Sequence, residues 1–127
     1  MALILDTNAL SALADGDLVL RRAIEDEPDY AVPVVVLGEF LFGIRRSRHR
    51  RRYELWLETL LPQLEILSLG AETASYYAQV RSELTDAGRP LPANDLWIAA
   101  LARQHAMALV TRDKHFQAVQ RLQIVSW

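Results

Sequence analysis

The sequence predicts an α/β fold with a parallel sheet of five strands and helices on both of its faces. Short apolar segments that suit strands alternate with helical patterns five times along the chain, as in parallel α/β folds. The 127 residues are 51% hydrophobic and 24% charged, the composition of an ordinary globular domain. There is no internal repeat, linker or low-complexity segment, so we expect a single domain over residues 1–127.

The first predicted strand is ALIL at residues 2–5, an apolar run that ends on three small polar residues, Asp6, Thr7 and Asn8. Such a run followed by residues that start helices predicts a buried strand leading directly into a helix. Asp6 is well placed to cap this helix, because a carboxylate accepts hydrogen bonds from free backbone N–H groups. Alternatively, Thr7 and Asn8 cap the helix in its place and leave the Asp6 carboxylate available as a ligand.

A second helix and a second strand follow. Leu20, Ala23 and Ile24 have helical spacing, and a strand is expected over residues 30–32. Pro33 suits the first turn of the next helix, since it has no N–H to leave unpaired there.

The next two helices differ in character. VVLGEFLFGI at residues 35–44 is an apolar helix with a single acid, Glu39. The helix after it is amphipathic and ends at Pro62, which cannot continue it. Its apolar stripe is Tyr53, Trp56, Leu57, Leu60 and Leu61.

A third strand is expected in LEILSL, residues 64–69, followed by a longer helix that Gly88 closes at its C-terminus. The apolar positions of that helix are Tyr77, Val80, Leu84 and Ala87.

The remaining elements complete the alternation. GRPLP at residues 88–92 is a stiff connector, and the helix over residues 94–105 is apolar on nearly every side, so we expect it to be buried. ALVT at residues 108–111 is the fourth strand, RDKHF at residues 112–116 turns into a short helix, and LQIVSW at residues 122–127 is the last strand.

Composition excludes several classes of protein. With no cysteine, the chain has neither disulfides nor thiolate metal sites. No uncharged apolar run approaches the ~18 residues that a membrane span requires, and too few apolar residues precede Asp6 for a signal peptide. We therefore expect a cytoplasmic protein that does not interact with membranes.

Four acidic residues are unusual because each interrupts apolar sequence or follows a strand: Asp6, Glu39, Asp95 and Asp113. Each has an ordinary structural explanation. Asp6 and Asp95 suit helix caps, and Asp113 suits the cap of the following turn. Glu39 has only a narrow polar face around it, so it either faces solvent or is buried near a cation.

Topology gives these acids a common location. Asp6 follows the first strand and Asp113 the fourth, so both lie at the carboxyl edge of the sheet if those strands are neighbours. Asp95 opens the helix that leads into the fourth strand and is expected at the opposite edge. It reaches the same cleft only if that helix is canted or if a long excursion such as residues 88–92 precedes it.

Carboxylates that converge repel one another, by ~4 kcal/mol per pair at ~4 Å and an effective dielectric constant near 20. Such a cluster requires protons or a divalent cation. Ligands that are all oxygen favour Mg²⁺, or Mn²⁺, over zinc.

The basic residues are distributed unevenly, although the net charge is only −2. RRSRHRRR is either a solvated helix end, a nucleic-acid patch or a surface for an acidic partner protein. Its arginines are Arg45, Arg46, Arg48, Arg50, Arg51 and Arg52. The histidines His49, His105 and His115 do not stand beside a candidate nucleophile in any pattern typical of catalysis.

Four motifs in order resemble the PIN-domain ribonucleases, and within them the VapC-type toxins: ILDTNAL, EFLFG, NDLWIAAL and VTRDKHF. The resemblance covers the whole chain and implies a PIN-like three-layer α/β/α sandwich. It also implies that Asp6, Glu39, Asp95 and Asp113 bind Mg²⁺, with Asn8 and Thr111 as polar supports. Arg112 stands where relatives have Asn, and Asp113 occupies the most variable acidic position, so it binds the metal directly or through a water.

The resemblance further implies a Mg²⁺-dependent endoribonuclease that leaves 5′-phosphate and 3′-hydroxyl ends on an RNA of the tRNA or rRNA class. Its partners would be a VapB-like antitoxin, lying across the cleft, and a second copy in a homodimer. Basic residues must flank an acidic cleft that binds RNA. The candidates are the six arginines of the run, with Arg89 and Arg112 closer in sequence to the expected ligands. The alternatives are a PIN nuclease of RNA processing without an antitoxin, and a catalytically inactive module that binds RNA or protein.

Overall fold

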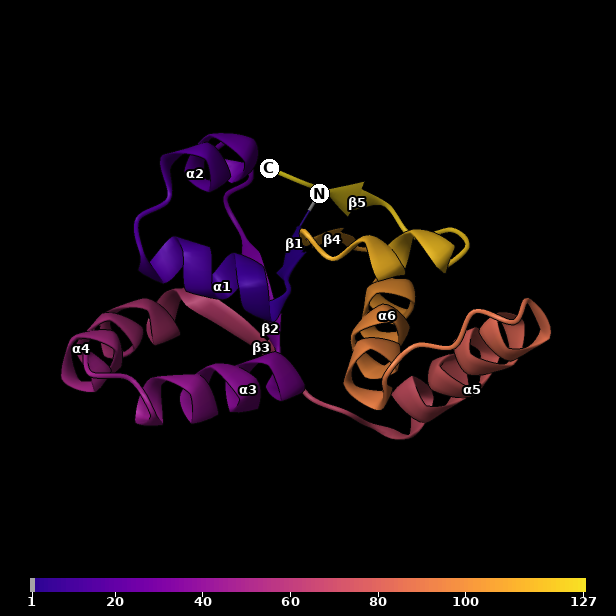
Figure 1. The fold of residues 1–127 in the computed structure, drawn as a ribbon. Coiled ribbons are helices and arrows are strands. Elements are labelled where there is room, and N and C mark those ends of the chain that lie inside the picture. Colours follow the sequence, from indigo (N-terminus) through magenta and orange to yellow (C-terminus); the bar gives the residue numbers. More distant parts are fainter. Residues whose placement is uncertain (1) are drawn as a thin grey trace.

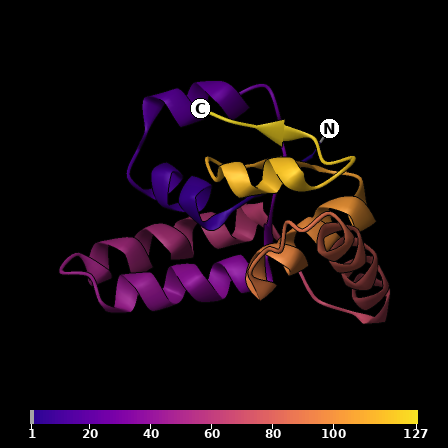
Figure 2. The same ribbon diagram turned by 45° about the vertical axis from the view of Figure 1, so that its right-hand side comes forward.

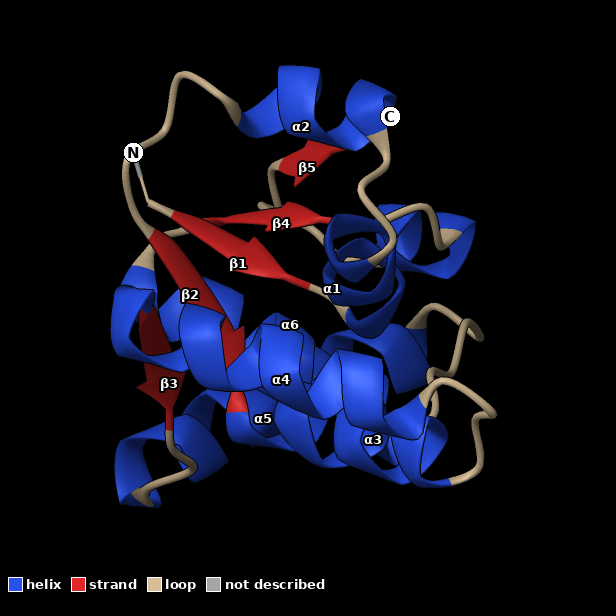
Figure 3. Cartoon of the chain, turned by 90° about the vertical axis from the view of Figure 1, so that its left-hand side faces the viewer, coloured by secondary structure: helices blue, strands red, loops and turns tan. Residues whose placement is uncertain are grey.

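The five predicted strands form one parallel sheet in the computed structural model, which describes residues 2–127. The strands are β1 (Leu3–Leu5), β2 (Tyr30–Pro33), β3 (Leu64–Leu67), β4 (Ala108–Val110) and β5 (Ile124–Val125). Their order is β3-β2-β1-β4-β5, and all four neighbouring pairs are parallel. In Figure 3, the arrows of β1 and its neighbour β4 point the same way, toward the start of α1. The order reverses between β1 and β4, where parallel α/β folds bind ligands.

Helices cover both faces of the sheet. They are α1 (Thr7–Ala14), α2 (Leu18–Ile24), α3 (Val34–Arg45), α4 (Arg50–Leu60), α5 (Ala71–Asp86) and α6 (Ala93–His105). Two short 3-10 helices, η1 (Leu61–Gln63) and η2 (Lys114–Ala118), complete the fold. Helices α1 to α4 lie on one side of the sheet and α5 and α6 on the other, which confirms the predicted three layers (Figure 1). In Figure 2, α3 and α4 run side by side as a hairpin on the side away from α5 and α6.

The core lies around the central strands. Every residue of β1 and of β4 is buried, as expected for strands with helices on both faces. Helix α6 is buried as predicted, and its inner residues pack in the same cluster as the strands. Among residues 2–127, no helix combines the length and the apolar character needed to cross a bilayer.

Two tryptophans pack against aromatic side chains of neighbouring helices. Trp56 lies 5.9 Å from Phe40, measured between ring centroids, and joins α4 to α3. Trp97 stacks on Tyr77 at 4.1 Å and joins α6 to α5.

Several predicted details shift by a residue or a turn. Ala23 is exposed, and only Leu20 and Ile24 of that helical set are buried. Pro33 precedes α3 as its N-cap and does not lie in its first turn. Helix α4 ends at Leu60, before Pro62, and Pro62 itself lies in the short helix η1 that follows directly.

The direction of α6 decides where Asp95 lies. Only Ala106 and Met107 separate α6 from β4, so the helix must run antiparallel to that strand and begin at the carboxyl edge of the sheet. Ala106 makes this reversal possible in the left-handed conformation, with φ of 52°. The sequence analysis expected Asp95 at the opposite edge of the sheet, and this was wrong. After β3, the chain passes through α5 and residues 88–92 before α6 crosses back to the start of β4.

Candidate active site

Asp6 lies at the end of β1 and caps α1 with its own carboxylate. Its Oδ1 accepts a hydrogen bond of 2.8 Å from the backbone N–H of Thr7. Its Oδ2 accepts 2.7 Å from the Thr111 hydroxyl and 3.3 Å from Asn8 Nδ2. The prediction that Thr7 and Asn8 cap the helix in its place is therefore wrong, because their side chains bond to other groups of the site.

Asn8 and Thr111 lie beside Asp6, where the sequence expected its polar supports. The Asn8 amide also donates to Thr111 Oγ1 at 3.3 Å, and its Oδ1 accepts 3.2 Å from the backbone N–H of Arg112. These contacts connect the start of α1 to the segment after β4. They hold the end of β1 and the end of β4 in a fixed relation, and Thr111 is buried there.

Glu39 reaches the same edge from the middle of α3. It is half-buried, and its Oε2 accepts a hydrogen bond of 2.9 Å from the Thr7 hydroxyl. Its Oε1 accepts 2.6 Å from Asn94 Nδ2 at the start of α6. Of the two predicted environments, free exposure to solvent is not observed, because the side chain is half-buried and two neutral groups donate to its carboxylate.

Thr7 and Asn94 were not recognised from the sequence as parts of the site. Asn94 precedes Asp95 in the first turn of α6, and this adjacency is the one signal that pointed to it. Thr7 was assigned to helix capping. Its hydroxyl contacts Glu39, a residue 32 positions away, and only the packing of α1 against α3 brings the two together.

Asp95 lies in the first turn of α6 but does not cap it. The N-cap is Pro92, so the predicted capping role is wrong. Burial, together with the charges of Asp6, Asp113 and Glu39, raises the pKa of Asp95 from 3.8 to about 6. Asp95 is thus within electrostatic range of the other three carboxylates predicted from the sequence.

Asp113 caps η2, which confirms the structural role that the sequence suggested for it. Its Oδ1 accepts 2.9 Å from the backbone N–H of His115 and lies 2.9 Å from Nδ1 of the same residue. The backbone N–H of Asp113 donates to Thr111 Oγ1 at 3.0 Å, which joins it to Asp6 through one hydroxyl. The short helix is held to the core by Phe116, which is fully buried.

The site therefore holds more negative charge than its contacts neutralise. In the part of the chain that the structure describes, His115 is the one basic side chain paired with any of the four acids. Burial also raises the pKa of Asp6, against the hydrogen bonds from Thr111 and Thr7 that lower it. Such a carboxylate set is stabilised by binding protons or a cation.

The donor set suits Mg²⁺, although the side chains are not drawn tightly together. As they lie, no three Asp, Glu or His side chains among the described residues converge to hold one ion. Mg²⁺ is commonly bound by one or two carboxylates and keeps several waters, so it does not need a tight protein cage. The carboxylates of Asp6 and Glu39 are partly buried and accept hydrogen bonds from neutral groups, so their oxygens suit a Mg²⁺ ion that keeps several waters.

The arginines suggested as flanking groups occupy different surroundings. Arg112 donates from Nε to the carbonyl of Trp127 at 3.2 Å and lies 4.5 Å above the ring of the same residue, so it fastens the C-terminus. Arg45 to Arg52 lie at the turn between α3 and α4, with Arg50 paired to Glu54. Arg89 is exposed in the connection between α5 and α6.

Removing the charge of Asp95 is expected to stabilise the metal-free protein at neutral pH. A folded-state pKa of about 6, above the value of 3.8 for a free side chain, means that Asp95 contributes stability below pH 3.8 and loses it as the pH rises through 6. In EDTA at pH 7, Asp95→Asn should therefore raise the free energy of unfolding by ~1 kcal/mol after solvent screening. This corresponds to an increase of roughly 3–5 °C in the midpoint of thermal unfolding.

Thermal unfolding of both proteins at pH 4 and pH 7 measures this effect. The two should unfold at closer temperatures at pH 4, where Asp95 is protonated in the folded protein. Equal midpoints at pH 7 would show that the carboxylates around Asp95 impose no electrostatic cost.

The sequence matches the PIN domain family model over residues 3–122. Ribonuclease VapC2 of Rickettsia felis is 29% identical over 132 residues, which cover 100% of this chain and 98% of that protein. Ribonuclease VapC5 of Mycobacterium tuberculosis is 31% identical over 118 residues, which cover 91% of this chain and 86% of that protein.

Among solved structures, the fold is similar to that of VapBC2 from Rickettsia felis bound to a DNA fragment from its promoter. The TM-score is 0.88 at 27% identity, and the alignment covers 100% of this chain and 99% of that one. The family match spans nearly all of the described residues and agrees with the four motifs read from the sequence. This chain belongs to the PIN-domain family, among the VapC ribonucleases, the toxins of VapBC toxin–antitoxin systems.

Proposed function

We propose that this protein is a Mg²⁺-dependent endoribonuclease whose active site is the carboxylate set Asp6, Glu39, Asp95 and Asp113. The observation that carries the proposal is the hydrogen-bond network that runs from Asn94 through Glu39, Thr7, Asp6 and Thr111 to Asp113. It brings Glu39, Asp6 and Asp113 from three separate segments to one edge of the sheet. Asp95 follows Asn94 directly in the first turn of α6 and so lies at the same edge. Bringing four such acids together costs free energy in the absence of a cation, whereas a metal-dependent phosphodiester hydrolase uses a carboxylate set to bind its metal.

Some residues of the site would bind the cation, and others position the carboxylates that bind it. Asp6 and Asp95 would hold the cation, with Glu39 beside them and Asp113 acting directly or through a water. Thr7 and Asn94 orient the Glu39 carboxylate, each through one oxygen. Thr111 and Asn8 donate to the same oxygen of Asp6 and so fix the direction of its remaining lone pairs.

When bound, Mg²⁺ would lower the pKa of a coordinated water and neutralise charge on the phosphate oxygens. Hydrolysis then adds a water oxygen to phosphorus, breaks the bond from phosphorus to O3′, and leaves a proton on O3′. The products are a 5′-phosphate and a 3′-hydroxyl end. Neither product contains the cyclic phosphate that attack by the ribose 2′-hydroxyl forms.

The partners follow from the relatives. VapBC-5 from Mycobacterium tuberculosis, a similar structure, is a member of the VapBC family of toxin-antitoxin systems, which supports a VapB-like antitoxin for this chain. A homodimer and a target of the tRNA or rRNA class are further parts of the proposal. The intact set of acids favours an active nuclease over an inactive RNA-binding or protein-binding module.

Removing the metal tests the function most directly. The purified protein is incubated with tRNA and with rRNA fragments in 5–10 mM Mg²⁺, roughly a saturating level for a site of several carboxylates, and in excess EDTA. We expect cleavage in Mg²⁺ only, with ends that a 5′-phosphate-dependent exonuclease degrades. Equal cleavage in EDTA, or products that end in a 2′,3′-cyclic phosphate, would refute the metal-dependent hydrolysis.

A further inference from the structure

A basic cleft lies beside the acidic site, between η2 and the connection from α5 to α6. Its volume is about 460 Å³, and its lining includes Arg89, Pro90, Leu91, Lys114 and His115. Proline fixes the backbone of the connection, so one wall of the cleft is rigid. The backbone N–H of Arg89 adds a hydrogen bond of 2.9 Å to the carbonyl of Leu84, which anchors this wall to the end of α5.

Arg89 and Lys114 are the two permanent cations of this cleft. Both residues are exposed, and neither side chain makes a hydrogen bond or ion pair with any of residues 2–127. Two other basic side chains are engaged, since Arg103 pairs with Glu83 at 2.9 Å and Arg112 donates to the carbonyl of Trp127. The charges of Arg89 and Lys114 are therefore available to a ligand.

The cleft borders the site. Lys114 follows Asp113 directly, so their Cα atoms are about 3.8 Å apart. His115 lines the cleft and contacts Asp113 at 2.9 Å, and it acts electrostatically on Asp95 as well. The sign of the charge thus changes over the width of one or two residues.

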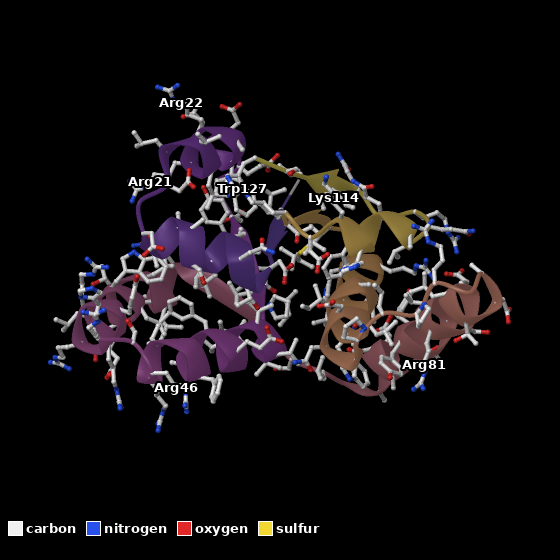
Figure 4. All side chains as sticks on the ribbon, in the orientation of Figure 1. Arg21, Arg22, Arg46, Arg81, Lys114 and Trp127 are labelled. Carbon is white, nitrogen blue, oxygen red and sulfur yellow. The ribbon has the colours of Figure 1, made fainter. Side chains whose placement is uncertain are left out.

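The other basic group lies elsewhere. Arg45 begins six residues beyond Glu39, which is about 9 Å along the helix axis, and the rest of the run continues away from the site. In Figure 4, Arg46 projects below α3, while Lys114 lies on the opposite side of the view, beside the segment that carries Asp113. Arg46 also packs on the ring of Phe42, at 5.7 Å.

We propose that this cleft, with Arg89 and Lys114, binds the phosphate of an RNA nucleotide next to the one that is cleaved. The inference rests on the proposed function and extends it to the substrate path. An anionic strand cannot approach four carboxylates without cations close by. Lys114 adjoins Asp113, Arg89 lines the same cleft, and neither side chain is paired with any of residues 2–127. Pro90 and Leu91 add an apolar wall on which the sugar or base of that nucleotide can pack.

Binding and turnover of RNA test the proposal separately. Binding is measured by fluorescence anisotropy of a labelled single-stranded RNA, in the Asp6→Asn background so that no cleavage occurs. Arg89→Ala with Lys114→Ala should raise Kd roughly tenfold at low salt and reduce the slope of log K against log salt by about 0.7 for each phosphate that the variant no longer binds. In the otherwise native protein, the same pair should raise KM with little change in kcat, because the phosphate is bound both before and during the reaction.

Charge-matched variants keep the test specific. Arg21→Ala with Arg22→Ala removes two charges from α2, where both side chains project away from the molecule (Figure 4), and should leave Kd and salt slope near those of the parent. Lys114→Arg should retain binding. Equal losses in the two double variants, or unchanged binding in the Arg89 and Lys114 pair, would overturn the cleft assignment while cleavage by the parent still stood.

Two further results would distinguish failure of the cleft assignment from failure of the proposed function. If RNA affinity is unchanged but affinity for an acidic protein partner falls, the cleft is a protein interface and the proposal is wrong. If the parent neither binds nor cleaves RNA, the proposed function itself fails. Circular dichroism of each variant excludes unfolding as the cause.

Discussion

Asp6→Asn is expected to lower RNA cleavage by about 10³-fold while the protein remains folded. Loss of charge from the carboxylate most deeply buried in the site removes several kcal/mol of transition-state stabilisation, and each 1.36 kcal/mol is about tenfold in rate. Asn keeps the oxygen that caps α1, so the 2.8 Å hydrogen bond from the N–H of Thr7 can persist. The rate is measured under single-turnover conditions in saturating Mg²⁺.

Asp17→Asn is the matched control for this experiment. Asp17 caps α2 with its own carboxylate, which accepts hydrogen bonds from the backbone of Val19 and Leu20, and it lies outside the acidic set. The same chemical change at this second helix start should alter cleavage by less than about threefold, because surface changes outside a site have small effects. If both variants lose activity equally, Asp6 acts through stability and not through the chemistry.

The second large effect concerns the short helix that carries Asp113. Phe116→Ala is expected to lower the free energy of unfolding by about 3–5 kcal/mol, the usual cost of deleting a buried aromatic ring. Phe116 is completely buried, and its side chain fixes η2 to the core. Because Asp113 caps this helix, cleavage by the remaining folded protein should also fall.

Phe42→Ala gives the comparison at an exposed phenylalanine. The Phe42 side chain is 64% exposed on α3, so its removal should cost less than about 1 kcal/mol. Urea unfolding of the two variants at neutral pH measures both costs. Similar midpoints would contradict the anchoring of η2 by Phe116.

Local rules were sufficient to identify most elements and most site residues from the sequence. The apolar run at residues 2–5, the helix over residues 94–105 and the positive φ of Gly88 (67°) are where periodicity and end signals predict them. The four acids were identified because each interrupts an apolar segment or follows a strand. Chemical type and position along the chain are sufficient for that inference, and no packing information is needed.

Contacts between distant segments were not predictable in the same way. The Thr7 hydroxyl bonds to Glu39, and the Asn94 amide bonds to the same carboxylate from a third element. Each contact depends on how two helices pack, and that packing depends on side chains spread over the whole chain. The assignment of Thr7 to capping was wrong for this reason, since capping rules consider only residues that are near in sequence.

Periodicity and residue type were therefore enough to predict the fold class and the alternation of elements, and to select four acids as the candidate site. The neutral donors that hold Asp6 and Glu39 were found only in the tertiary structure. The same is true of the separation of the Arg89 and Lys114 cleft from the arginine run. These depend on strand order and helix direction. Both are set by the burial of the whole apolar surface at once, which no short segment of sequence specifies.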